Sequence, residues 1–122
     1  MIKIEAVLEE DGTLRACRAS GHAKHSKILK FFPIFRVKRI EADTVCAAVS
    51  VLIWTAIITL SGRKGIEIRC DAPAPGQMWL EADYQAEGKE FLFAAGVFLL
   101  EGLKFVAREY PKNCELKIEI VN

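Results

Sequence analysis

The sequence predicts a single α+β domain in which two helices pack on a mainly antiparallel sheet. Three observations lead to this fold class: short runs of alternating apolar and charged residues, two much longer apolar stretches, and turn-forming residues between them. Taken in chain order, these segments give the element order ββαββαβ. The chain has 122 residues, which is enough for one hydrophobic core, so we expect residues 1–122 to form one domain.

The short alternating segments predict two hairpins and a last strand. Residues 2–8 and 14–20 form the first pair, joined where Asp-Gly follows Glu10, a strong hairpin signal. Residues 66–70 and 78–83 form the second pair, with the Pro- and Gly-containing segment 72–76 as its turn. The last strand is predicted from apolar residues that alternate with charges, namely Leu116, Ile118 and Ile120.

The two long apolar stretches predict helices. The first is expected to begin at Asp43, acting as the N-cap, and to end near Leu60, before a Ser-Gly pair. Because it is apolar nearly all round, it should be the most buried element. The second is expected to run from Gly88 to about Tyr110, where a proline ends it. Its residues near one face are Phe91, Ala94, Ala95, Phe98, Gly102, Phe105 and Val106.

The charge and the cysteine content argue against a protein that binds polyanions with its whole surface and against a metal-binding protein. The formal net charge is only +1, but the segment 24–42 contains six Lys or Arg residues and one Glu, which makes it a long basic and aromatic connection. The four cysteines are scattered without a close His partner, so we expect no metal site and free thiols. They are Cys17, Cys46, Cys70 and Cys114.

A membrane span and an export signal are not expected. Residues 44–60 carry no charge, but they are fewer than the roughly 20 residues that span a bilayer, and predicted strands flank them. We therefore expect a buried core helix and no membrane partner. The charged, strand-like N-terminus does not resemble a signal peptide, so the expected location is the cytoplasm.

Two short motifs suggest a nucleophile and its base. His22 follows Ser20-Gly21 at the end of a predicted strand, and Cys46 lies within the segment Asp43–Ser50. In the predicted first turn of a helix, unpaired N–H groups and the helix dipole would stabilise the Cys46 thiolate. A nearby His22 imidazole could take the thiol proton and later protonate a leaving amine. The alternative is that Cys46 only packs in the core, as cysteines often do.

Three neighbouring residues are candidates for supporting roles. Asp43 and Ser50 lie three residues before and four residues after Cys46, on its side of a helix. Asp43 either caps the helix or orients His22, and Ser50 either donates a hydrogen bond to the thiolate or fills a gap. Gly21 would allow the backbone to approach the helix or the substrate closely.

The segments Gly21-His22-Ala23 and Asp43–Ser50 together resemble the Prp family, the bacterial ribosomal-processing cysteine proteases. The resemblance covers nearly the whole chain in length and element order. It implies that His22 is the catalytic histidine and Cys46 the nucleophile, with Asp43 and Ser50 as the polar residues beside them.

The resemblance also implies a substrate and an assembly. Such enzymes remove a short N-terminal extension from large-subunit ribosomal protein twenty-seven, cutting after a Phe-Phe pair. By this resemblance the chain is a cytoplasmic endopeptidase and a homodimer, and it needs no cofactor.

One departure from the family pattern lies between the two motifs. Relatives have a short loop there, often containing glycine, whereas 23 residues separate His22 from Cys46 here, and Ala42 stands where a glycine is usual. The long loop has three interpretations. It is a solvated insertion that docks on the domain, or an arm that contacts the ribosome or RNA, or a segment that places its own Phe31-Phe32 pair in the active site, where Pro33 would resist cleavage.

Two other functions stay open at this stage. An inactive relative would bind a ribosomal protein or RNA through residues 24–42 and would keep its partner when Cys46 is replaced. A purely structural α+β module would have a Cys46 thiol that does not react with alkylating agents at neutral pH.

Overall fold

The computed structural model describes residues 1–21, 33–74 and 76–121. Within them the order is β1 (Ile2–Glu9), β2 (Leu14–Ser20), α1 (Pro33–Leu60), β3 (Ile66–Ala74) and β4 (Gln77–Tyr84). A short 3-10 turn (Ala86–Gly88), α2 (Lys89–Glu109) and β5 (Cys114–Val121) follow. The predicted order ββαββαβ and the α+β class are therefore confirmed.

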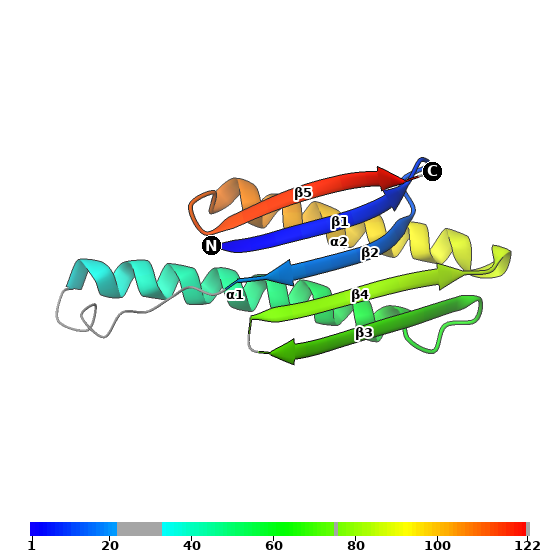
Figure 1. The fold of residues 1–122 in the computed structure, drawn as a ribbon, viewed down its shortest axis with the longest axis horizontal. Helices are drawn as coiled ribbons and strands as arrows, with labels where there is room; N and C mark the ends of the chain where they lie inside the picture. The colour runs from blue at the N-terminus through cyan, green and yellow to red at the C-terminus, as the bar shows by residue number, and fades with distance from the viewer. Residues whose placement is uncertain (22–32, 75, 122) are drawn as a thin grey trace.

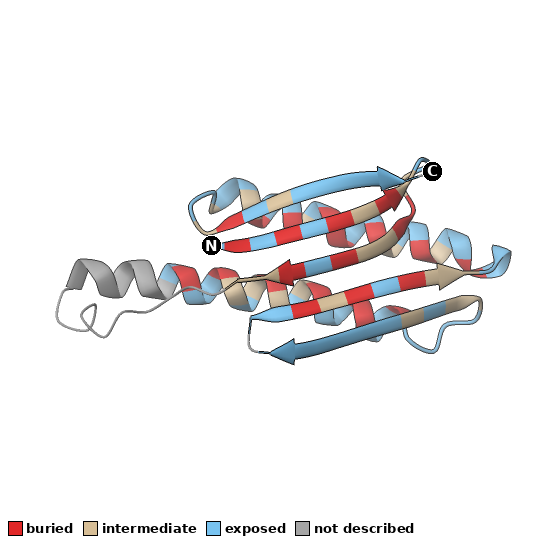
Figure 2. Cartoon of the chain, viewed as in Figure 1, coloured by how far each residue is buried: buried red, intermediate tan, exposed pale blue. Residues whose placement is uncertain are grey.

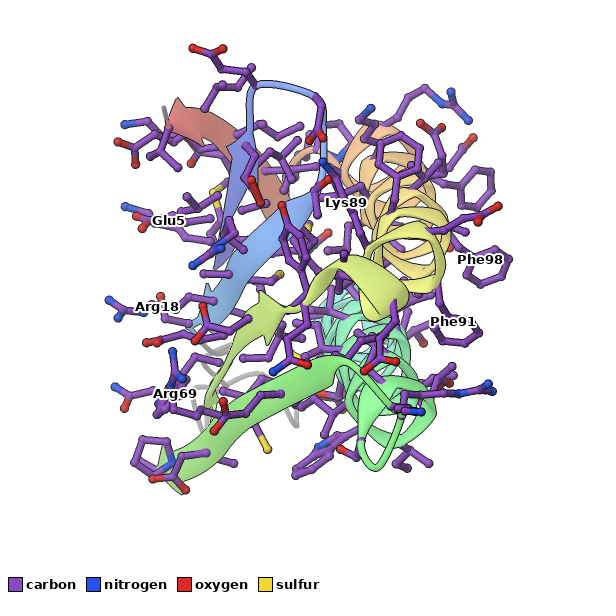
Figure 3. The ribbon with its side chains drawn as sticks, turned by 90° about the vertical axis from the view of Figure 1, so that its right-hand side faces the viewer. Glu5, Arg18, Arg69, Lys89, Phe91 and Phe98 are labelled. Carbon is purple, nitrogen blue, oxygen red and sulfur yellow. The ribbon has the colours of Figure 1, made fainter. Side chains whose placement is uncertain are left out.

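The strands form one sheet in the order β3-β4-β2-β1-β5. All neighbouring pairs are antiparallel except β1 and β5, which are parallel. Both helices lie on the same face of this sheet (Figure 1). The side chains of Glu5, Arg18 and Arg69 project from the opposite face (Figure 3).

The core lies between the sheet and the helices. The central strands alternate buried and exposed residues, whereas β3 and β5 at the edges are mostly exposed (Figure 2). This alternation is expected for a sheet with one covered face. The largest fully buried side chains include Ile4, Leu14, Ile53, Leu80 and Leu99, which come from strands and both helices.

The first hairpin turns at the predicted Asp-Gly pair. The Asp11 carboxylate accepts hydrogen bonds from the Thr13 amide at 2.9 Å and from the Thr13 hydroxyl at 2.7 Å. Gly12 has φ +94°, a conformation that favours glycine. Asp11 also forms an ion pair with Lys89 at the start of α2, at 2.8 Å. Its hydrogen bonds to Lys89 and Thr13 lower the pKa of the Asp11 carboxyl.

The prediction that the first helix begins at Asp43 is wrong, because α1 begins at Pro33. Residues 33–42 of the predicted loop 24–42 are thus helical. Proline is favoured at a first helical position, where its missing N–H would have no intrahelical partner anyway. The following residues Arg36, Lys38 and Arg39 are good helix formers, so the helix continues into the apolar stretch.

The second hairpin is longer and tighter than predicted. The segment 72–74 belongs to β3 and not to the turn, and β4 begins at Gln77. The pairing with β4 shifts its register between Asp71 and Ala74. Pro73 is tolerated in this strand because β3 is an edge strand, where the missing N–H costs no hydrogen bond on the open side.

The two helices are only partly covered. Helix α1 is not the most buried element as predicted, because Val51 and Ile58 are exposed while Val45 and Ile53 are buried. Helix α2 packs mainly through other residues than the face named above, because Phe98 and Phe105 are exposed and only Val106 of that face is buried. The buried residues of α2 are Leu92, Gly96, Leu99, Leu100, Leu103 and Val106.

One described helix, over Glu41–Leu60, is long and apolar enough to cross a membrane by length and composition alone. A third of this window is buried within the fold, and the core helix of a soluble protein meets the same criterion. Its buried residues Val45, Val49 and Ile53 pack in the same cluster as Ile2 and Ile4 of the sheet. This packing agrees with the expected core helix.

Candidate active site

A cavity of about 520 Å³ lies beside Cys46. Its lining residues come from helix α1, from the start of β1 and the end of β2, and from the β3–β4 hairpin. Its lining residues are apolar except for the Cys46 thiol and two polar side chains, Ser50 and Gln77. A concave, mostly apolar site with a few polar groups is typical of a ligand-binding site.

Helix α1 contributes a single stripe of side chains to this cavity. Cys46, Ser50 and Trp54 are each four residues apart and all line it. Residues spaced by four lie on one side of a helix, one turn above another. Cys46 is half-buried and packs against the main core cluster, so its thiol is sheltered on one side and faces the cavity on the other.

Gly21 fixes the chain at the end of β2, where the cavity begins. Its φ of +118° favours glycine, and a Cβ placed there would overlap the Met1 carbonyl oxygen. The Gly21 amide donates a hydrogen bond to the Gly76 carbonyl at 3.0 Å. The close approach at Gly21 is therefore to Met1 and Ile2, at the start of β1, and not to the helix.

His22 and the Phe31-Phe32 pair lie outside the described residues. Gly21, the chain neighbour of His22, lines the same cavity as Cys46. The residue before the predicted base and the predicted nucleophile therefore line one cavity.

The start of a helix does not activate Cys46. Because α1 begins at Pro33, Cys46 lies in the helix interior, where backbone N–H groups are bonded to carbonyl groups one turn back. The predicted position in the first turn, with unpaired N–H groups that stabilise the Cys46 thiolate, is therefore wrong. Asp43 is likewise not an N-cap but an exposed residue inside the helix, about one turn before Cys46.

Ser50 lies where the sequence predicts it, one turn after Cys46 and in the wall of the cavity. Asp43 does not line the cavity. Of the five predicted site residues, the structure thus brings together Gly21, Cys46 and Ser50.

The other cysteines have different surroundings. Burial raises the pKa of Cys17 to about 12. Burial, followed by the nearby Cys46 charge, also raises the pKa of Cys114. Cys70 is exposed on the edge strand β3. Cys46 is therefore the one described thiol that is both partly sheltered and open to a cavity.

The sequence analysis missed the far end of the cavity. Trp54 could have been found from its spacing, because it continues the series of Cys46 and Ser50. Ala72, Pro73 and Met78 line the same cavity. No local signal identifies these three, since they approach α1 only through the pairing of β4 with β2.

No group of three or more His, Cys, Asp or Glu side chains that could hold a metal ion occurs among the described residues. The polar groups of the cavity are a thiol, a hydroxyl and an amide. This set fits covalent chemistry at sulfur.

Known proteins share this architecture. The fold resembles the ribosomal processing protease Prp from S. aureus in complex with a substrate peptide, with a TM-score of 0.72 and 16% identity over 98% of this chain and 100% of that one. It also resembles SMU.848 from Streptococcus mutans, with a TM-score of 0.72 and 22% identity over 99% of this chain and 96% of that one.

A second structure of the S. aureus protease, with a covalently linked product peptide, aligns with a TM-score of 0.71 and 16% identity, over 98% of this chain and 100% of that one. A search of curated protein sequences found no match. The sequence profile described as cysteine protease Prp matches residues 1–115. The chain therefore belongs to the cysteine protease Prp family.

Proposed function

We propose that this protein is a cysteine endopeptidase that processes a ribosomal protein, with Cys46 as nucleophile and His22 as general base and acid. The observation that carries the proposal is that Cys46 opens into a cavity that also contacts Gly21, the residue before His22. The family supports a cysteine protease. The similar S. aureus protease forms a covalent bond with a product peptide, as a thiol nucleophile would.

In the proposed reaction His22 takes the thiol proton, and the Cys46 sulfur attacks the carbonyl carbon of the scissile peptide bond. His22 then gives its proton to the leaving amine, the C–N bond breaks, and an acyl thioester remains on Cys46. Water, deprotonated by His22, attacks this thioester and releases the carboxylate product and the thiol. Ser50 supports the sulfur by a hydrogen bond, and Asp43 orients His22.

The proposed substrate is the N-terminal extension of large-subunit ribosomal protein twenty-seven, cut after a Phe-Phe pair in the cytoplasm. The apolar lining of the cavity supports an apolar peptide substrate. An arm that contacts ribosomal RNA is a further part of the proposal, and it rests on the six cations of residues 24–42.

The test is cleavage of a peptide that spans the Phe-Phe junction, followed by mass spectrometry. We expect Cys46→Ala to lower kcat/KM by about 10³-fold or more, because the nucleophile is lost. Cys70→Ala, which removes an exposed thiol, should leave the rate unchanged. If Cys46→Ala cleaves as fast as wild type, or if cells carrying it keep normally trimmed ribosomal protein, the proposal is wrong.

We also propose a homodimer. Helices α1 and α2 expose apolar side chains on the side away from the sheet: Val51, Ile58, Phe98 and Phe105. Phe91 and Phe98 project from this side in Figure 3. Exposed apolar side chains on one side of a fold are typical of an interface, and a second copy offers the same side chains in return.

A further inference from the structure

We infer that Trp54 forms a distal subsite of the substrate groove and selects an apolar side chain three to four residues from the scissile bond. This inference rests on the proposed function, because it takes Cys46 as the nucleophile that attacks the scissile bond. It adds a specificity-determining residue that does not take part in the chemical steps.

The distance between Cys46 and Trp54 sets the position of the subsite. They are eight residues apart on one side of α1, and at 1.5 Å per residue this separates them by about 12 Å along the helix axis. An extended peptide advances about 3.3 Å per residue. A peptide whose carbonyl carbon lies at Cys46 and which runs along the groove therefore reaches Trp54 after three to four residues.

The surroundings of Trp54 favour an apolar side chain. Ala72, Pro73 and Met78 line the same cavity, and among its described lining residues none carries a formal charge apart from an ionised Cys46. A charged peptide side chain would lose water there without gaining a partner, which is unfavourable. An aliphatic or aromatic side chain would instead bury apolar surface against the indole.

Core packing does not explain Trp54. Its side chain is 43% exposed, whereas the neighbouring Ile53 is fully buried. Trp54 also differs from Val51 and Ile58 on the same helix, because those two do not line the groove. Ala72 and Pro73 of β3 line the same cavity as Trp54 and add apolar surface to the subsite.

The experiment measures kcat/KM for peptides that keep the Phe-Phe junction and carry Glu at one position at a time, up to four residues on either side of the cut. In wild type we expect a loss of about tenfold or more for Glu at one position three or four residues away. Trp54→Ala should reduce this loss to less than about threefold and leave the preference at the junction unchanged. Trp79→Ala, the same change on the other side of the sheet, should keep the wild-type profile.

Tryptophan fluorescence measures peptide binding at Trp54 directly. In the double variant Cys46→Ala and Trp79→Phe, Trp54 is the remaining tryptophan, and Trp79 lies on the other side of the sheet. Adding the uncut peptide should shift the Trp54 emission to shorter wavelength, because the bound side chain excludes water from the indole.

The outcomes separate the two proposals. If wild type cleaves the peptides but Glu lowers kcat/KM equally at all distal positions, the proposed subsite is wrong and the proposed protease activity is not affected. The same conclusion follows if Trp54→Ala keeps the wild-type loss. If Trp54→Ala changes the molecular mass in light scattering and not the peptide profile, Trp54 belongs to an interface. If wild type cleaves none of the peptides and Trp54 emission does not respond, the proposed function fails as well.

Discussion

The four cysteine residues show how strongly local surroundings decide the chemistry of one side-chain type. Cys17 faces the core from β2 and is fully buried, so its thiolate would be without solvent or a compensating charge. Cys114 begins β5 next to Ile2 and packs in the same cluster as Cys46. Of the four cysteines, only Cys46 is both partly buried and in the lining of the cavity beside α1. The reactivity of a cysteine thiol thus depends on its position in the fold, which the number of cysteines in the sequence does not reveal.

The raised pKa of Cys17 predicts a pH dependence of stability. An unfolded chain ionises this thiol near pH 9, whereas the folded protein holds it protonated up to a pKa of about 12. The free energy of unfolding should therefore be unaffected by Cys17 below about pH 8 and should fall by up to about 1.4 kcal/mol per pH unit between 9 and 12. Urea unfolding of wild type and Cys17→Ala between about pH 8 and 10.5 measures this.

In Cys17→Ala the decrease should be smaller, with a remainder from Cys114, whose pKa is also raised. Parallel curves for the two proteins would contradict the assignment. Cys70→Ala is the control, because its exposed side chain should leave the wild-type slope unchanged.

At the residue scale the sequence predicts that Cys46 and Ser50 share one side of α1, but it does not predict the surroundings of Cys46. Cys46 and Ser50 were identified from a motif, and helical spacing alone puts them on one side of α1. The activation of Cys46 by a helix terminus was wrong, because the prediction took Asp43 as a cap although Pro33 offers an earlier start. Trp54 was within reach of the same spacing argument, whereas Met78 required the sheet order.

At the scale of elements, α2 approaches both the sheet and α1 at glycines. A Cβ at Gly96 would lie 2.8 Å from the Leu14 Cβ, so α2 comes very close to β2 there. A Cβ at Gly102 would lie 2.8 Å from a Leu52 Cδ atom, at the contact with α1. The first contact involves an atom fixed to the backbone, and the second involves the end of a flexible side chain.

This difference predicts opposite outcomes for two similar substitutions. Both Gly96→Ala and Gly102→Ala gain up to about 1 kcal/mol of helix propensity. Gly96→Ala must also shift α2 from the sheet, which costs about 1–3 kcal/mol as overpacking, so we expect net destabilisation. Gly102→Ala needs only a rotamer change of Leu52 and should be neutral or slightly stabilising. Urea unfolding measures both, and equal effects would contradict the packing described.

Element boundaries were predictable where the turn residues act locally. The Asp-Gly turn and the end of α2 at Tyr110 were found to within a residue or two. The tip of the second hairpin was not, because the prediction read Pro73 as a turn residue, whereas a proline is allowed in a strand that turns out to lie at an edge. Edge position depends on the whole sheet and cannot be read from one segment.

At the scale of the molecule, a two-layer fold of this size covers only one side of each layer. The open sheet face carries charged side chains such as Glu5 and Arg69, and Arg69 forms ion pairs with Glu81 at 3.1 Å and with Asp83 at 2.8 Å. The outer side of the helices instead carries Phe98 and Ile58, which are 75% and 72% exposed. The sheet face is therefore suited to water, and the helix face to another protein surface.

The helix face explains why the core side of α2 was hard to predict. This helix has leucines on one side and phenylalanines on another, so its apolar pattern is compatible with either side facing the core. The leucines pack on the sheet, and the phenylalanines lie outward, where a second copy could cover them. The polar stripe of α2, formed by Glu90, Glu101, Lys104 and Arg108, is narrow, so it does not by itself mark which apolar side faces the core.

Replacing Phe98 by Glu tests this division. A carboxylate at the centre of a paired apolar surface would be desolvated in both copies, so Phe98→Glu should weaken dimerisation by about tenfold or more and give a monomer in light scattering at micromolar concentration. Arg18→Glu, which changes charge on the exposed sheet face, should keep the wild-type mass. Because Phe98 is mostly exposed in one copy, the variant should fold. A wild-type protein that is monomeric under the same conditions would rule out the dimer, and a dimeric Phe98→Glu would move its interface away from the helices.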